Sequence, residues 1–144
     1  MMFNSEKAVE IINEQTPIDP MVVGRVKKAL AGKGVVLDQS EELDDYLVFQ
    51  GKEAITFSDG RTIIIHTNAS ASGFYEELIH YGQIKSGRAI EGNKENNLLM
   101  EIEAQERLLK YRKAYRITHF ETEVLTNNLN HYRKQLQELK NGGS

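Results

Sequence analysis

Two short runs of β-branched and aromatic residues, one on each side of a Ser-Asp-Gly turn, constrain the fold of this chain most. The runs are EAITF and RTIIIH, and the turn between them is Ser58 to Gly60. Such a turn between two apolar runs is typical of an antiparallel hairpin. The segments before and after it instead repeat their apolar residues at helical spacing. We therefore expect an α+β fold with a small antiparallel sheet between N-terminal helices and three C-terminal helices.

The segment before the hairpin contains the signals of helices and one strand. SEKAVEIINEQ has helical apolar spacing, and DPMVVGRVKKALAGKG begins with Asp19 as an N-cap and ends at Gly32 or Gly34. VVLD is a strand candidate, and SEELDDYLVFQG is a short helix or a turn. Residues 1–50 are thus expected to be a helical N-terminal part of one domain that spans residues 1–144.

Three helices are expected after the hairpin. The first carries FYEELIHYGQIK, has Ser70 or Ser72 as its N-cap and ends near Gly87. A loop then leads to a long helix over about 96–115. The last helix begins at Thr118, where the glutamate three residues later forms a capping box. Together with the hairpin, these helices make residues 51–140 the expected core of the domain.

Composition limits the classes of function. The chain has 144 residues, 40% of them hydrophobic and 27% charged, which describes an ordinary globular protein. No apolar run approaches the roughly 18 residues needed to cross a bilayer, so no membrane partner is expected. The first residues do not resemble a signal peptide, so we expect a cytoplasmic protein in the producing cell, with secretion by a non-classical route as an alternative. Without cysteine, any metal must be held by nitrogen and oxygen ligands.

The run FYEELIHYGQ places two carboxylates and an imidazole on one helix. Glu76 and His80 are four residues apart, so both project from the same face, with Glu77 beside them. The pattern is H-E-x-x-H with glutamate at the first position. In that motif the outer residues bind Zn²⁺ and the middle glutamate is the general base. The alternative is that Glu76 and Glu77 are surface charges and His80 a core histidine.

A third ligand is available in the next helix, LLMEIEAQERLL. Its apolar stripe contains Leu98 and Ile102. At about 100° per residue, Glu101 lies at the edge of this stripe and Glu103 on its outer side. A carboxylate at the margin of a core is costly unless something pairs with it, and a metal is such a partner. We expect Glu103 and Glu106 to be solvated charges.

The hairpin, the helix with E-E-x-x-H-x-x-Q and the helix with E-x-E-A-Q together resemble the zincin-like metallopeptidase domains of bacterial polymorphic toxins. More distantly, they resemble the metallopeptidases that cleave phage-type repressors. The resemblance covers about residues 55–136, and standard zincins have histidine where this chain has glutamate. The residues that carry it are Glu76, Glu77, His80, Gln83, Glu101, Ala104 and Gln105.

This resemblance implies a minimal zincin-like fold in which the metal helix packs under a sheet, with RTIIIH as the edge strand that lines the cleft. It implies Glu76, His80 and Glu101 as ligands of Zn²⁺, with Mn²⁺ or Fe²⁺ as alternatives for a ligand set rich in carboxylates. Gln83 and Gln105 would contact substrate or support the ligands. A protein or peptide substrate and an immunity protein are the implied partners.

The remaining histidines and tyrosines are weaker candidates. A di-iron site needs a second Glu-x-x-His, and the chain has none. His66 is expected at the surface at the end of its strand, and His119 and His131 as structural or solvated residues. Tyr111 and Tyr115, like Tyr132, are expected in the core.

Two other functions stay open. The cluster RLLKYRKAYR, residues 107–116, has five basic side chains, and in a nuclease or RNA-binding toxin module it would contact phosphates while His80 and Glu77 act as an acid–base pair. A solvated helix face is the simpler interpretation of this cluster. Alternatively, the paired C-terminal helices are the docking surface of a non-catalytic interaction module.

Overall fold

The computed structural model describes residues 15–90 and 92–142 and divides into two compact units. The first unit ends at Tyr81 and the second begins at Gly82, so the boundary falls within one helix, α4 (Ala71–Lys85). The helix expected over SEKAVEIINEQ lies outside the described residues, apart from Gln15. Of the helices in the described ranges, none combines the length and the apolar character that a membrane span requires.

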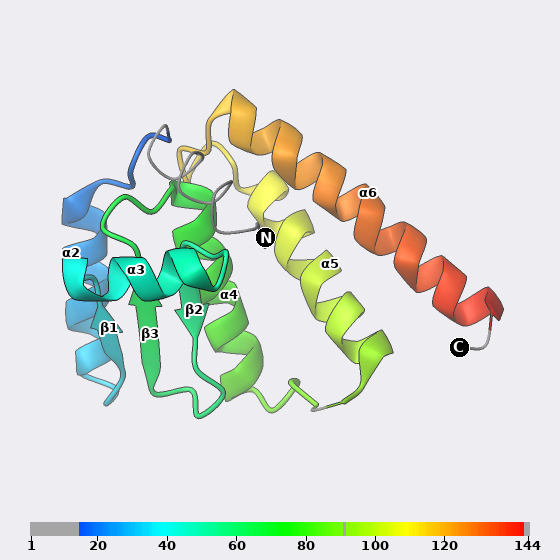
Figure 1. Ribbon diagram of the computed structural model, residues 1–144, viewed down its shortest axis with the longest axis horizontal. Helices are drawn as coiled ribbons and strands as arrows, with labels where there is room; N and C mark the ends of the chain where they lie inside the picture. The colour runs from blue at the N-terminus through cyan, green and yellow to red at the C-terminus, as the bar shows by residue number, and fades with distance from the viewer. Residues whose placement is uncertain (1–14, 91, 143–144) are drawn as a thin grey trace. The chain divides into compact units, whose positions relative to one another are not determined.

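The first unit begins with three elements that the sequence predicts well (Figure 1). Helix α2 (Pro20–Ala31) starts after Asp19, whose Oδ1 accepts a hydrogen bond from the Met21 backbone N–H at 2.9 Å. This bond satisfies one of the donors that a helix N-terminus leaves unpaired. Strand β1 (Val36–Asp38) and helix α3 (Glu41–Phe49) follow.

The predicted hairpin is present, and it belongs to a mixed sheet. Strands β2 (Ala54–Thr56) and β3 (Thr62–Ile65) are antiparallel, while β1 pairs with β3 in parallel. The strand order is β1-β3-β2. The prediction that RTIIIH forms an edge strand is therefore wrong, because β1 occupies the other side of β3. The edge strand of the hairpin is β2.

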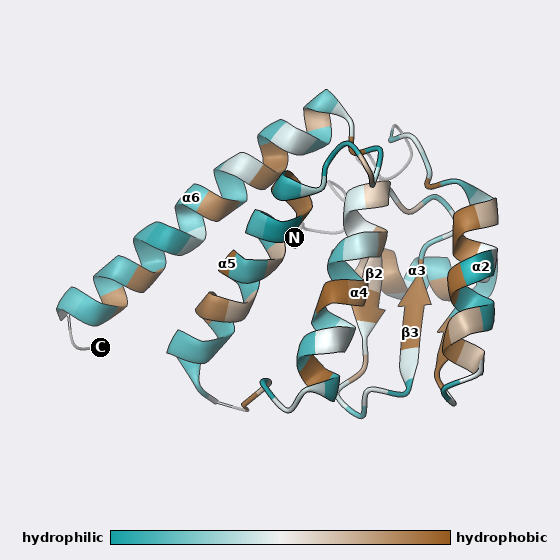
Figure 2. Cartoon of the chain, turned by 180° about the vertical axis from the view of Figure 1, so that it is seen from behind, coloured by the Kyte–Doolittle hydropathy of each residue, from teal (hydrophilic) through white to brown (hydrophobic). Residues whose placement is uncertain are grey.

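Alternation along β3 divides the core of this unit between two faces of the sheet. Ile63 and Ile65 cluster with Leu30 of α2 and Phe74 of α4. Ile64, which points to the opposite face, is buried where α3 covers the sheet. Figures 1 and 2 agree on this arrangement, since α3 lies in front of the strands in the first view and α2 and α4 in the second.

Helix α4 begins as predicted, with Ser70 as its N-cap. The Ser70 hydroxyl accepts a hydrogen bond from the Gly73 backbone N–H at 3.1 Å. The chain leaves the helix after Lys85 and turns at Gly87, which has a positive φ of 76°. Because this backbone region favours glycine, Gly87 explains why the helix stops where the sequence predicts.

The second unit is built from α5 (Lys94–Lys110) and α6 (His119–Gly142), which form a helical hairpin (Figure 1). The predicted capping box is present, since the Thr118 and Glu121 side chains accept hydrogen bonds from each other's backbone N–H. Helix α5 ends earlier than the expected 115, because the chain turns over residues 111–116. No proline or glycine marks this end in the sequence, so a prediction from apolar spacing alone makes the helix too long.

Apolar contacts and ion pairs hold α5 and α6 together. Ile102 and Leu108 of α5 and Leu125 and Leu129 of α6 are buried. Two ion pairs join the helices, Arg133 to Glu106 at 3.0 Å and Lys140 to Glu95 at 3.9 Å. Both pairs are exposed, so each contributes little and the apolar side chains supply most of the stability. The described chain is thus a small α+β fold with three C-terminal helices, as predicted.

A half-buried carboxylate joins the start of β2 to the start of α4. Glu53, one residue before β2, accepts hydrogen bonds at Oε1 from the Ser70 backbone N–H at 2.8 Å and from the Ser70 hydroxyl. Its side chain also lies directly against Gly73, where an added Cβ would come within 2.0 Å of Oε1. Glycine at position 73 therefore lets the strand and the helix approach each other.

We expect Gly73→Ala to destabilise the protein, because the new methyl group must displace Glu53 from its two hydrogen bonds with Ser70. The expected loss is about 1–3 kcal/mol in the free energy of unfolding, measured by urea denaturation. Gly82→Ala is the matched control in the same helix, since nothing lies within 4 Å of its added Cβ. That change should stabilise by about 0.5–1 kcal/mol. A loss at position 73 that persists in a Glu53→Ala background would contradict this explanation.

Candidate metal centre

Helix α4 carries Glu76 and His80 on the same face, because the residues are one helical turn apart. Both side chains are half-buried. Gly73 lies about one turn before Glu76 on this face, so the Glu53 carboxylate packs close to it as well. The face therefore combines an imidazole with carboxylates, all of them nitrogen and oxygen ligands suited to a divalent cation.

Glu76, His80 and Glu101 form a group that can bind a metal ion. Each residue offers one ligand atom, and the three atoms lie within 4.8 Å of one another. Ligand atoms around a tetrahedral zinc lie about 3.4 Å apart when the bonds are about 2.1 Å long. The charges also suit a divalent cation, because the two negative carboxylates balance its charge of +2 and a neutral imidazole adds none.

Glu77 is held next to this group by the edge strand. The Thr56 hydroxyl of β2 donates a hydrogen bond to Glu77 Oε2 at 2.7 Å. Burial is the main reason why the pKa of Glu77 is raised above 4.5, and the nearby Glu76 charge adds to this effect, while His80 and the Thr56 hydrogen bond oppose it. A carboxylate with a raised pKa is a stronger base, which suits proton transfer from water at neutral pH.

Glu53 extends the negative potential at the start of α4. Burial raises its pKa above 4.5, the hydrogen bonds from Ser70 oppose this shift, and the Glu76 charge adds to it. The Glu76 carboxylate thus makes it harder to ionise both Glu53 and Glu77. A cation bound at Glu76 would relieve this repulsion, so the electrostatics of the face favour cation binding.

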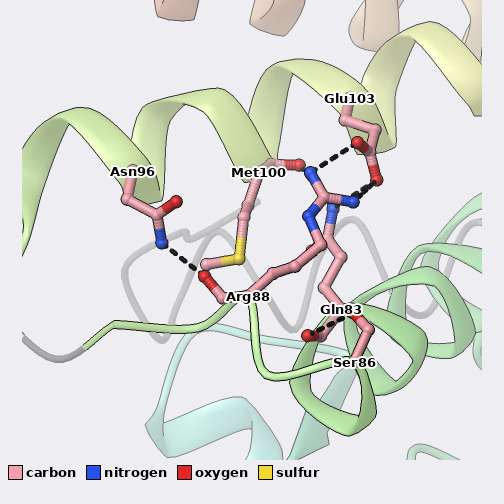
Figure 3. Close-up of polar contacts among 6 residues, drawn as sticks. All are labelled: Gln83, Ser86, Arg88, Asn96, Met100 and Glu103. Atoms are coloured by element: carbon pink, nitrogen blue, oxygen red, sulfur yellow. Dashed lines mark hydrogen bonds and ion pairs between the residues drawn. The ribbon is translucent and has the colours of Figure 1, made fainter.

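Gln83, in the last turn of α4, bonds to Met100 and Glu103 of α5 (Figure 3), which come before and after Glu101 in the sequence. The side chain is only 3% exposed, and its Nε2 donates hydrogen bonds to the Met100 carbonyl at 3.0 Å and to Glu103 Oε1 at 3.1 Å. Gln83 is therefore a buried contact of α5 and not a surface amide. These bonds fix the register of the α5 turn that carries Glu101.

Arg88 completes this connection. Its guanidinium donates two hydrogen bonds to the Glu103 carboxylate, at 2.7 and 2.6 Å, and its carbonyl accepts one from Asn96 at 2.6 Å. The Arg88 pair is the main cause that lowers the pKa of Glu103. Glu103 is thus paired, contrary to the expected solvated charge, because the chain after α4 folds back along α5. Nothing in the sequence marks Arg88 as its partner.

Gln105 lies one turn after Glu101 on the same face of α5, and both Gln105 and the adjacent Ala104 are fully buried. A fully buried amide in an amphipathic helix is unusual. The proposed supporting role of Gln105 stays a prediction, and its burial is compatible with that role.

His66 is buried, not at the surface as expected, and it lies in a second polar cluster. It is 8% exposed, its Nδ1 accepts a hydrogen bond from the Asn68 backbone N–H at 2.9 Å, and its Nε2 lies 3.7 Å from Asp44 Oδ2. These contacts tie α3 to the loop before α4. His119 and His131 are exposed, as expected for solvated residues.

Thr56 and Glu53 are the contributors that sequence reasoning missed. Thr56 pairs with Ile63 in the sheet and so shares the face that packs against α4, a placement that alternation along β2 predicts. A polar residue on an inward face was therefore a usable signal. Glu53 precedes its strand and has no such signal in the sequence.

The described residues thus form a small α+β fold with a Glu-His-Glu group that can bind a cation. Comparisons with protein families, with curated proteins and with solved structures each found no match. The functional argument therefore depends on the residues themselves.

We expect Glu53→Gln to become more stable relative to the wild type as the pH rises from about 4.5 to about 8. A carboxyl with a raised pKa binds its proton more tightly in the folded state, so ionisation above about pH 4.5 lowers the free energy of unfolding. Glutamine keeps an acceptor for Ser70 and has no charge to bury. Urea denaturation with EDTA across this range measures the difference. Glu42→Gln on exposed α3 is the control and should show a nearly constant difference.

Proposed function

We propose that this chain is a metal-dependent hydrolase, a peptidase-like toxin domain with Glu77 as its general base. The observation that carries the proposal is the convergence of ligand atoms from Glu76, His80 and Glu101 beside Glu77, a half-buried carboxylate that is not one of the three. A structural site needs only the ligands. A hydrolytic site also needs a base next to them, and Glu77 supplies it.

The proposed chemistry divides between the ion and the chain. A bound Zn²⁺, or alternatively Mn²⁺ or Fe²⁺, supplies a Lewis acid that polarises a carbonyl and acidifies water. Glu77 accepts the proton of the attacking water, and the Thr56 hydroxyl holds its Oε2 in place meanwhile. Neutral His80 is required for binding, so metal affinity should fall as the pH is lowered.

The edge strand supports a peptide as the substrate. Strand β2 is at the edge of the sheet and runs beside α4. Glu53, just before the strand, contacts Gly73, and Thr56, at its end, contacts Glu77. An extended peptide can add to such an edge through its backbone hydrogen bonds. The resemblance to zincin-like toxin domains implies the same kind of edge, although β2 takes the place that was expected for RTIIIH.

Two competing interpretations explain less of this geometry. As plain surface charges, Glu76 and Glu77 would not be half-buried, and Glu77 would not accept a hydrogen bond from the inward side of β2. As an acid–base pair of a nuclease, Glu77 and His80 would have a role, while the convergence of Glu76 and Glu101 would have none. The metal hydrolase accounts for all four residues.

We expect the purified protein to bind one Zn²⁺ after reconstitution, and His80→Ala to lower the affinity by at least about 100-fold, because one of three ligands is lost. Isothermal titration calorimetry measures both. His119→Ala, which removes an exposed histidine on α6, is the matched control and should bind like the wild type. Equal affinities of the two variants, or a wild type that binds no divalent ion, would refute the metal site.

We expect Glu77→Gln to keep its metal and to lose at least about 100-fold in cleavage rate, because the amide cannot accept the proton of water. Mass spectrometry of a mixed peptide library, incubated with zinc-loaded protein, measures the cleavage. Glu123→Gln on exposed α6 is the control for loss of one carboxylate. Retained cleavage by the Glu77 variant would contradict its role as the base.

A further inference from the structure

The turn between α5 and α6 is strongly basic. Residues 107–120 contain Arg107, Lys110, Arg112, Lys113 and Arg116 and no acidic residue. All five side chains are exposed. The second unit, residues 82–144, has 11 basic and 8 acidic side chains, whereas residues 1–81 have 7 and 13. The positive charge of the chain is thus concentrated in one short segment, which we call the basic turn (residues 107–116).

Stabilisation of the helix ends explains only some of the positive charges in the basic turn. Arg107 and Lys110 lie in the last turn of α5, where cations interact favourably with the helix dipole, and Arg112 donates a hydrogen bond to the Leu109 carbonyl at 2.8 Å. Lys113 and Arg116 lie beyond that helix. Arg116 is also two residues before Thr118, the N-cap of α6, where a positive charge is unfavourable.

Arg116 has a backbone conformation that usually favours glycine. Among the described residues other than glycine, only Arg116 has a positive φ, at 55°. The turn closes around it, since the Ile117 backbone N–H donates to the Arg112 carbonyl at 2.9 Å. Glycine is the usual residue at such a position, and any other side chain adds strain. The chain thus keeps a cation where both the backbone and the helix dipole disfavour it.

Exposed aromatic rings flank these cations. Tyr111 is 41% exposed and Phe120 is 61% exposed, so the expectation that Tyr111 lies in the core is wrong. Lys110 Nζ lies 5.4 Å from the centre of the Tyr111 ring. A cluster of cations with exposed rings nearby in the sequence matches single-stranded nucleic acids, in which phosphates alternate with bases that stack on aromatic side chains. An anionic membrane would instead favour cations along one face of an amphipathic helix.

From these observations we infer that the basic turn, with Tyr111 and Phe120, is a binding surface for single-stranded nucleic acid. Cations contact successive phosphates, and the two rings stack with bases. This inference is independent of the proposed hydrolase, because it uses none of the residues of the candidate metal centre. It is tested on metal-free protein, so the failure of one proposal leaves the other intact.

The test is the binding of a fluorescent 20-nucleotide single-stranded RNA in EDTA, followed by anisotropy over a range of salt concentrations. Five phosphate contacts predict a slope of about −3.5 for log K against log salt. Arg116→Gly should weaken binding and reduce the magnitude of the slope by about 0.7, while raising the urea midpoint because the strain is removed. Tyr111→Ala should weaken binding and leave the slope nearly unchanged.

Lys134→Gln is the matched control, because it removes one exposed cation from α6, outside the basic turn. It should leave the affinity and the salt slope within error of the wild type. The inference is overturned if RNA does not bind at low salt, or if Lys134→Gln and Arg116→Gly weaken binding equally. Polyglutamate that displaces RNA at equal charge, or anionic phosphatidylglycerol vesicles that bind more tightly than RNA, would also overturn it.

Discussion

The contact between β2 and α4 is the constraint on which the rest of the candidate site depends. Glu53 anchors the start of the strand at Ser70 and Gly73, and Thr56 holds Glu77 one helical turn later. Both contacts require the strand to lie very close to the helix, which is possible because position 73 has no side chain. The same alignment puts the edge of the sheet beside the face of α4 that carries the proposed ligands and base. The contact between β2 and α4 therefore both holds the fold together and positions the proposed general base.

Local signals in the sequence were sufficient for most elements of the fold. The Ser-Asp-Gly turn, the Asp19 cap and the capping box at Thr118 act within a few residues, and the structure confirms each of them. Non-local pairing was not predictable in this way. The place of β3 at the centre of the sheet depends on β1, some 25 residues earlier, and the early end of α5 has no local stop signal. Pairing partners are chosen by tertiary packing, which a single sequence does not display.

The residues of the candidate site likewise include some that local patterns predict and others that depend on tertiary contacts. Helical spacing and the cost of a carboxylate beside a core predict Glu76, His80 and Glu101 as ligands, and their ligand atoms lie within 4.8 Å of one another. The residues that orient such a site were harder to find. Thr56 was visible only through alternation, and Arg88, which pairs with Glu103, comes from a segment that sequence patterns describe as a loop. Ligands repeat a chemical motif, whereas their supports depend on which segments happen to meet.

Electrostatic cost links the two proposals. Burying Glu53 and Glu77 near Glu76 raises the pKa of both, and that cost is unexplained by packing, because apolar residues of similar size would fill the same space. Arg116 is costly in a different way, through its backbone conformation. A folded chain of marginal stability keeps such features where a ligand offsets them. A cation bound at Glu76, as proposed, would offset the first cost by neutralising the carboxylates. A polyanion does not remove the strain at Arg116. It would bind the arginine side chain, however, and glycine at the same position offers no such contact.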